Sequence, residues 1–286
     1  MPLIFVPTPL GNLRDITLRS LDALRDCSLV VAEDSRVARK LLGLLDIHGK
    51  DIWSYHEHNA AGATAMILER ARSESIAVVT DAGTPGISDP GTALVAAARE
   101  TGISVEVLPG PSAAIGVAVL SGFDLRRFVF EGFAPRASVA RRRAFTDARS
   151  FGVTSIWYES PKRILAALAD LAAVAADARV FLLREYTKLH EQQLFGNATE
   201  VAAALATPVR GEIAFAIAFL PASPLQAPSA EQLHGAVDEL LGEGRSVAEI
   251  AKSLAEKGYG SRRDLYATAA ERKQRRKVAG GGRERA

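Results

Sequence analysis

Residues 76–91 read Ile-Ala-Val-Val-Thr-Asp-Ala-Gly-Thr-Pro-Gly-Ile-Ser-Asp-Pro-Gly and join a short apolar run to a long loop. The run Ile76–Val79 has the length and the β-branched content of a buried strand. Residues 81–91 hold three glycines, two prolines and two aspartates, more turn chemistry than a chain reversal needs. In open α/β sheets, ligands bind at the carboxyl ends of strands. We therefore predict a ligand-binding loop at residues 81–91.

The same alternation of apolar runs and amphipathic stretches extends over most of the chain. Besides 76–79, buried strands are predicted at residues 3–6, 29–32, 105–108, near 128, 153–158, 180–183 and 213–219. In the first four of these runs, from 3–6 to 105–108, the βαβ rhythm is typical of a mostly parallel sheet. A second series of strands and helices begins near residue 128. Thr17 is predicted to cap a helix that places Leu18, Leu21 and Leu24 on one face.

The pattern divides the chain into three regions. We expect an N-terminal α/β domain at 1–124 and a second α/β domain at 125–220. Pro221, Pro224 and Pro228 cannot continue a helix or a strand, so they indicate a linker. A small helical domain is expected at 229–277, with a basic tail that runs to 286.

The last region is predicted to be both helical and basic. Ser229, Ser246 and Ser261 stand where N-caps of three short helices are expected. From residue 262 onward nine Lys or Arg face three acids, although the whole chain carries a net charge of only +2. A basic last helix in a helix-turn-helix-like unit is typical of nucleic-acid binding. Helical hairpins also serve as oligomerisation modules, and a basic tail can aid solubility alone.

Composition excludes several classes of protein. With 48% hydrophobic and 24% charged residues, the chain of 286 residues is expected to fold into globular domains. No apolar run approaches the roughly 20 residues that span a bilayer. The N-terminus lacks the pattern of a secretory leader, so we expect a cytoplasmic protein. Cys27 is the only cysteine, and the segment His56-Glu57-His58 lacks a third spaced ligand, so no metal is predicted.

The loop at 81–91 lacks the glycine fingerprints of dinucleotide and triphosphate sites. A ligand with a sulfonium, an amino acid end and a nucleoside would need carboxylates and exposed backbone groups, which this loop offers. Loops at 6–12 and 109–113 also follow predicted strands and are expected at the same sheet edge. Ser112 would cap the next helix and turn its first N–H groups to the cleft, although a purely structural cap has the same sequence.

Six motifs together resemble the branch of the tetrapyrrole methylase superfamily that modifies ribosomal RNA. They are Pro-Thr-Pro-Leu-Gly-Asn at 7–12, Ala-Glu-Asp-Ser at 32–35, the loop at 81–91, Pro-Gly-Pro-Ser-Ala at 109–113, Tyr-Glu-Ser-Pro at 158–161 and Arg-Glu-Tyr-Thr-Lys-Leu-His-Glu at 184–191. The resemblance implies two α/β domains of the tetrapyrrole methylase type with S-adenosylmethionine between them. It also implies 2'-O-methylation of a cytidine in the 16S rRNA of the small ribosomal subunit, by a homodimer.

The resemblance implies site residues as well. The methyl donor is expected to contact Leu10, Asp81, Gly83, Thr84, Pro85, Ser112, Ala113, Tyr158, Leu189, Gly211 and Glu212. A ribose hydroxyl needs a base or an oxyanion stabiliser, for which Lys188 and Glu191 are the first candidates and Glu131 and Asp89 the reserve. Phosphate contacts are expected instead from two basic clusters, the tail from residue 262 and the arginines between 136 and 149, with Arg141, Arg142, Arg143, Arg262 and Arg263 as the candidates.

Three other functions are compatible with parts of the sequence. A methylase of tetrapyrroles or other small molecules would share the scaffold, but the basic clusters argue against it. A non-catalytic RNA-binding factor would use the charged tail and bind no methyl donor. A Rossmann dehydrogenase is disfavoured by the missing glycine fingerprint.

Overall fold

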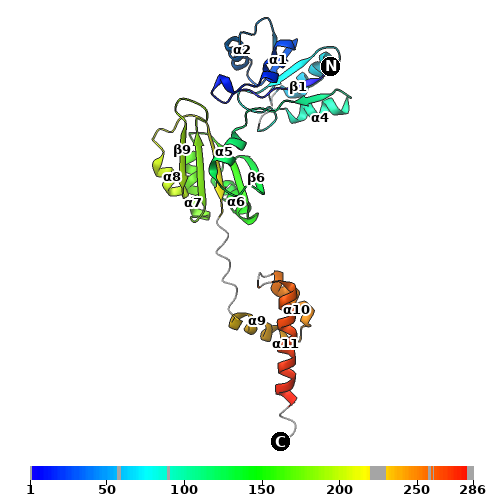
Figure 1. Ribbon diagram of the computed structural model, residues 1–286, viewed down its shortest axis with the longest axis vertical. Helices are drawn as coiled ribbons and strands as arrows, with labels where there is room; N and C mark the ends of the chain where they lie inside the picture. Colours follow the sequence, from blue (N-terminus) through cyan, green and yellow to red (C-terminus); the bar gives the residue numbers. More distant parts are fainter. Residues whose placement is uncertain are drawn as a thin grey trace. The chain divides into compact units, whose positions relative to one another are not determined.

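The computed structural model describes residues 2–56, 59–88, 91–219, 230–256, 259 and 261–281. They belong to two compact units, Met1–Phe219 and Leu220–Ala286. The first unit contains two sheets with helices, and the second is helical (Figure 1). Several residues considered above lie outside the described ranges, namely Glu57, His58, Asp89, Pro221, Pro224, Pro228, Ser229 and 282–286.

The first sheet contains five parallel strands in the order β3-β2-β4-β1-β5. The strands are β1 (Leu3–Phe5), β2 (Leu29–Ala32), β3 (Asp51–Ser54), β4 (Ile76–Val79) and β5 (Val105–Val107). The helical segments are η1 (Leu13–Asp15), α1 (Leu18–Asp26), α2 (Ser35–Leu44), α3 (Ala60–Ala71) and α4 (Thr92–Glu100). Every residue of β2 and β4 is buried, because helices cover both faces of a parallel sheet.

Helix α1 confirms the predicted cap and corrects the predicted face. The Thr17 hydroxyl accepts a hydrogen bond from the Ser20 N–H at 3.0 Å. Leu24 is fully buried, but Leu18 is 79% exposed and does not contribute to the core. Positions 18 and 24 lie about 120° apart around a helix, so Leu18 falls outside the face that Ser20 and Leu24 bury.

The second sheet has the order β6-β7-β10-β8-β9. Its strands are β6 (Phe128–Phe133), β7 (Thr154–Glu159), β8 (Arg179–Arg184), β9 (Gln192–Gly196) and β10 (Ile213–Ala218). Only β6 and β7 are parallel, whereas the other three pairs are antiparallel. The mostly parallel sheet predicted from the first four runs is confirmed in the first sheet, whereas the second sheet, whose strand directions were not predicted, is mostly antiparallel. Apolar runs reveal that strands exist, but they do not carry strand direction.

Helices α5 (Ala113–Ser121), α6 (Ser138–Ser150), α7 (Ile164–Val174) and α8 (Ala198–Ala204) cover the second sheet. Helix α5 buries Ala114, Val117 and Ala118 against Ile156 and Phe181 on one face of that sheet. The other face packs against α6, α7 and α8. The expected division near residue 124 assigns α5 to the first domain, but α5 packs on the second sheet, so the chain changes sheets before α5 begins.

The second unit contains α9 (Ala230–Gly242), α10 (Val247–Glu256) and α11 (Arg262–Gly281). The Ser246 and Ser261 hydroxyls accept hydrogen bonds from the N–H groups of Glu249 and Asp264, which confirms both as N-caps. The three helices share a small apolar core. No described helix combines the length and apolar character that a membrane span requires.

Arg141 lies inside the first unit, which corrects its assignment to an RNA-binding surface. Its side chain is 5% exposed, and its Nε donates to the Asp170 carboxylate at 2.8 Å. Its Nη2 donates to the same carboxylate, and its Nη1 donates to the carbonyl oxygens of Pro135 and Arg136. Arg142 bonds the same carboxylate from a half-exposed position, at 2.7 Å. The run of three arginines therefore contains one buried anchor, which residue type alone does not reveal.

Replacing Asp170 with Ala should destabilise the first unit by about 3 kcal/mol, because the Arg141 charge would remain buried without its partner. Denaturant unfolding followed by circular dichroism would measure the loss. Asp177→Ala is the matched control. Asp177 is exposed and pairs at 3.2 Å with Arg149, which lies on α6 like Arg141. The control should change the free energy of unfolding by less than about 1 kcal/mol. Equal effects of the two substitutions would contradict the anchoring role.

Candidate active site

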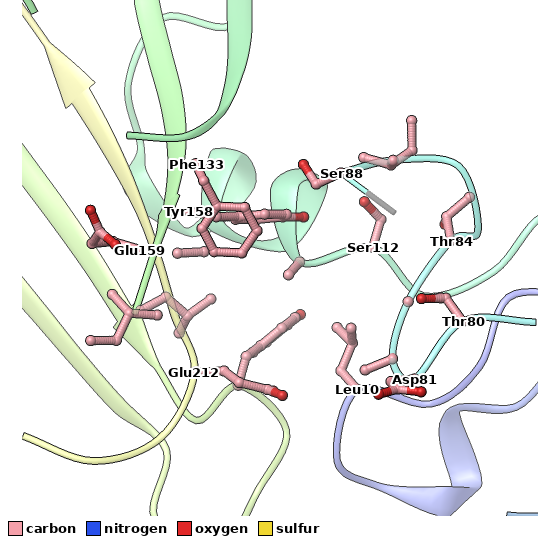
Figure 2. A pocket seen from close by; sticks show the side chains of 18 of the residues that line it. Leu10, Thr80, Asp81, Thr84, Ser88, Ser112, Phe133, Tyr158, Glu159 and Glu212 are labelled. Atoms are coloured by element: carbon pink, nitrogen blue, oxygen red, sulfur yellow. The ribbon is translucent and has the colours of Figure 1, made fainter. Parts of the chain in front are cut away.

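A cavity of about 370 Å³ lies in the first unit and is lined by residues from both sheets. This volume falls within the range of small-molecule sites. Figure 2 shows the loops that follow β1, β4 and β5 on one side, with residues of the second sheet opposite. The loops around Leu10, Asp81 and Ser112 line this one cavity, which confirms the predicted convergence. The second sheet contributes mainly the ends of β6, β7 and β8 and the start of β10.

Backbone and side-chain hydrogen bonds hold the three loops of the first sheet together. Thr8 and Gly83 form an antiparallel bridge, with N–H to O distances of 2.9 and 3.0 Å. Gly83 has a φ of 91°, which a side chain would rarely tolerate. The Thr84 hydroxyl donates to the Pro111 carbonyl oxygen at 2.9 Å. These bonds fix the positions of the loops before any ligand arrives.

Carboxylates gather on one side of the cavity. Asp81, Glu33 and Glu212 all line it. Partial burial and the negative charge of Glu33 raise the pKa of Asp81, while a hydrogen bond from the Asp34 N–H opposes the rise. The Thr80 hydroxyl holds Glu33 by donating at 3.0 Å. This side of the cavity is suited to a cation.

The segment 185–191 connects β8 to β9 and joins the two sheets beside the cavity. Glu185 and Thr187 adopt φ values of 53° and 64°, which are strained for residues with side chains. The Thr187 hydroxyl accepts a hydrogen bond from the Asn12 N–H at 3.1 Å, across to the first sheet. Glu185 Oε1 accepts from the Glu212 N–H at 3.0 Å. Lys188 Nζ then bridges Glu185 and Glu212, at 3.0 and 2.9 Å.

Tyr158 links the second sheet to the start of α5. Its hydroxyl oxygen accepts a hydrogen bond from the Ala114 N–H at 3.1 Å. Ser112 occupies the N-cap position of α5, as predicted, but its side chain makes no capping hydrogen bond. One of the first N–H groups of the helix is thus satisfied by Tyr158, while Ser112 contributes to the cavity lining.

Eight of the eleven residues expected to contact the methyl donor line the cavity. They are Leu10, Asp81, Gly83, Thr84, Ser112, Ala113, Tyr158 and Glu212. Pro85 and Leu189 do not line the cavity. Pro85 is buried within the loop 81–91, and Leu189 is 93% exposed on segment 185–191. Gly211 does not line the cavity, although it directly precedes Glu212. A Cβ on Gly211 would lie 2.4 Å from the side chain of Glu185, so this glycine provides space for the Glu185 contacts.

Sequence reasoning missed other residues that line the cavity. They are Glu33, Thr80, Ala82, Ile87, Ser88, Phe133, Glu159, Ser160, Pro161, Leu183, Tyr186, Ile213 and Ala214. The motifs at 32–35 and 158–161 contain Glu33 and Glu159, so those two had a usable signal. Tyr186 belongs to the motif at 184–191 and had the same kind of signal. Phe133 had none, because an aromatic residue at the end of an apolar strand equally fits a core position.

Of the four catalytic candidates, Asp89 lies outside the described residues, and the other three are not among the cavity-lining residues. Lys188 lies next to the cavity through its ion pair with Glu212. Glu191 accepts hydrogen bonds from the Thr187 N–H and the Gln193 amide, both at 2.8 Å. Glu131 is part of a β-bulge in β6, and partial burial, with a smaller contribution from Asp147, raises its pKa. Among the described residues, no group of three His, Cys, Asp or Glu side chains is arranged to hold a metal ion.

Comparison with known proteins identifies the class of this fold and cavity. The family described as "Tetrapyrrole (Corrin/Porphyrin) Methylases" matches residues 2–202. A crystal structure of diphthine synthase superposes with a TM-score of 0.60 at 18% identity, covering 76% of this chain and 90% of that one. The chain belongs to the tetrapyrrole methylase family.

Within this family, the chain is similar to proteins named "Ribosomal RNA small subunit methyltransferase I". The relative from Synechocystis sp. is 39% identical over 92% of this chain and 95% of its own length. The relative from Micromonospora olivasterospora is 42% identical over 77% of this chain and 71% of its own length. The Thermotoga maritima relative is 41% identical over 69% and 89% of the two chains.

Proposed function

We propose that the chain transfers a methyl group from S-adenosylmethionine to the ribose 2'-hydroxyl of a cytidine in 16S rRNA of the small ribosomal subunit. The observation that carries the proposal is a preformed cavity with carboxylates on one side, in a chain whose named relatives are ribosomal RNA methyltransferases. Because the proposed substrate is the small ribosomal subunit, we propose that the chain is located in the bacterial cytoplasm.

The chemistry of the cavity fits the proposed donor. Asp81, Glu33 and Glu212 provide negative charge for a sulfonium and an ammonium group, and Leu10, Ala113 and Ile213 provide apolar surface for a nucleoside. Bound S-adenosylmethionine supplies an activated methyl group on a positively charged sulfur. Because the leaving group departs neutral, the chain's main task is to hold donor and acceptor in line.

Lys188 is proposed to stabilise the acceptor oxygen as it loses its proton. Burial lowers the pKa of Lys188, but hydrogen bonds to Glu212 and Glu185 outweigh burial, and the pKa is raised overall. Lys188 is therefore an ammonium at neutral pH, which suits it to an oxyanion and excludes it as the base. Glu131 stays a sequence-based candidate for the proton acceptor, since partial burial raises its pKa but it does not line the cavity. Glu191 is proposed to position Thr187 and Lys188 through its hydrogen bond to the Thr187 N–H.

Exposed arginines are proposed to contact RNA phosphates. Arg142 and Arg143 lie on the solvent side of α6, and Arg262 and Arg263 begin α11. Phosphate contacts of this kind make binding depend on salt concentration. Their replacement by Ala should flatten the salt dependence of binding to 30S subunits without changing donor affinity.

A homodimer is proposed from the outer face of α5. This helix is apolar on all sides, and Ile115, Val119 and Leu120 remain exposed opposite the face that packs on the second sheet. An all-apolar helix is normally buried on every side. A second copy of the chain would cover the exposed half.

Transfer of tritiated methyl groups from S-adenosylmethionine to purified 30S subunits tests the proposed function directly. We expect label in 16S rRNA at a cytidine ribose, located by primer extension. Label that appears only in small molecules, or none with 30S subunits, would overturn the proposal.

The affinity for S-adenosylmethionine should fall as the pH drops through the raised pKa of Asp81, because protonation removes a charge that attracts the donor. The decline should begin at a higher pH than for an ordinary carboxyl. Asp81→Asn should weaken binding at neutral pH and reduce this dependence, as measured by calorimetry across a pH series. Asp22→Asn, on the exposed side of α1, is the control. Unchanged affinity in the Asp81 variant would rule out this contact.

Lys188→Ala should lower the single-turnover rate of methyl transfer about a hundredfold at saturating donor, the scale of losing one oxyanion stabiliser. Lys188→Arg should keep part of the rate because it keeps the charge, and the exposed Lys40→Ala is the control. The same assay on Glu131→Gln tests the proton acceptor. A variant with the wild-type rate removes its residue from the mechanism.

Val119→Glu should convert the dimer to a monomer. Val119 is 66% exposed on the apolar outer face of α5, and the substitution places a charge there. Analytical ultracentrifugation would show the change in mass. Val139→Glu is the control, since Val139 is exposed on α6 and away from that face. A wild-type chain that sediments as a monomer at micromolar concentration would refute the dimer.

A further inference from the structure

Phe133 is a cavity-lining residue that remains 56% exposed. A β-bulge in β6 brings it there. Phe130 pairs with Ile156, and Phe133 pairs with Tyr158, so three steps along β6 match two along β7. In a regular strand, residues three apart point to opposite faces. The extra residue places Phe130 and Phe133 on the same face, and bulges often redirect a side chain beside an active site.

The ring of Phe133 rests on a fixed aromatic support. Its centroid lies 5.7 Å from that of Tyr158, with an angle of 68° between the rings, and Phe130 contacts Tyr158 at 5.0 Å. The hydrogen bond from the Ala114 N–H holds Tyr158 in place. Figure 2 shows Phe133 beside Tyr158 and across the cavity from Leu10 and Asp81. The exposed aromatic is thus on the side away from Asp81.

The segment after Phe133 is held rigidly by two arginines. Arg163 donates to the Ala134 carbonyl oxygen and to Glu159, and the guanidinium of Arg141 donates to the Pro135 and Arg136 carbonyl oxygens. These bonds connect the end of β6 to the end of β7, so both strand ends form one fixed edge of the cavity.

Two cations extend from this edge into solvent. Arg136 follows Phe133 by three residues, and Lys162 directly follows the cavity-lining Pro161. Both side chains are exposed, and neither forms an ion pair with a described acidic residue. The cavity therefore has the carboxylates of Asp81, Glu33 and Glu212 on one side. On the other side it has the ring of Phe133 and the carboxylate of Glu159, which pairs with Arg163, and the exposed Arg136 and Lys162 follow these strand ends in the sequence. A cationic donor favours the first side, whereas a nucleotide with phosphates on both sides of its sugar favours the second.

We infer that the ends of β6 and β7 form the acceptor-nucleotide site, where Phe133 stacks on the base to be modified and Arg136 and Lys162 bind the flanking phosphates. Proteins that bind single-stranded RNA commonly stack unpaired bases on aromatic side chains. Stacking on Phe133 would hold the nucleotide turned outward, with its ribose directed into the cavity. The inference rests on the proposed function and adds the place where the RNA enters.

Phe133→Ala should weaken equilibrium binding to 30S subunits and raise the KM for them at least about fivefold, the lower end for loss of one base stack. The dissociation constant of S-adenosylmethionine should not change. Phe133→Trp should retain binding, and Phe133→Leu, apolar but without a π-face, should not. Phe151→Ala is the matched control, because Phe151 is also 56% exposed but lies at the end of α6 outside the cavity lining.

The double variant Arg136→Ala with Lys162→Ala should reduce the slope of log K against log salt concentration by about 1 to 2. Arg127→Ala is the control, since Arg127 is exposed at the opposite end of β6.

Three outcomes would overturn the inference: wild-type 30S binding by Phe133→Ala, an equal loss of donor affinity in that variant, or an unchanged salt slope in the double variant. A wild-type chain that binds 30S subunits but transfers no methyl would overturn the proposed function instead. In that case, the 30S affinities of the Phe133 variants relative to the wild-type chain would still test whether the RNA binds at this site.

Discussion

The backbone bridge between Thr8 and Gly83 is the constraint on which the cavity depends. It fixes the loop after β1 to the loop after β4, and Thr84 extends the connection to the loop after β5. Three loops that would each be mobile alone therefore form one wall. The sheet brings their starting points together because parallel strands end at the same edge, and the bridge then determines which backbone groups face the ligand.

The connection from β8 to β9, which lies beside the cavity, is held in place differently from the three loops. Segment 185–191 adopts strained backbone angles at Glu185 and Thr187, and ion pairs and hydrogen bonds around Lys188 compensate for that strain. Its hydrogen bond to Asn12 reaches the first sheet. The ion-paired segment thus adjoins the hydrogen-bonded loops, and of its residues Tyr186 lines the cavity.

The sequence predicted the first sheet better than the second. Strands β1, β2, β4 and β5 are short apolar runs, and their alternation with helices implies parallel order. β3 and β9 were missed because nearly all their residues are exposed or half-buried and do not stand out as an apolar run. The loops around Leu10, Asp81 and Ser112 were located correctly because glycine and proline have few structural uses.

Residues whose roles depend on long-range contacts could not be predicted. In the sequence, Arg141 cannot be distinguished from its neighbours Arg142 and Arg143. Only the structure shows that it is buried and paired with Asp170. Phe133 looks like a core aromatic until the bulge is known. In both cases the deciding partner lies on another element, so local pattern carries no information about it.

The bulge in β6 makes the aromatic wall sensitive to residue count as well as to residue type. Inserting one residue beside Glu131 while the single bulge is kept would shift Phe133 one step along β6 and turn its ring toward the face occupied by Trp157. Every side chain on the wall could then be retained while the wall itself was lost. For this reason, substitutions in β6 should be tolerated far more readily than changes in its length, both among natural variants and in any attempt to redesign the enzyme.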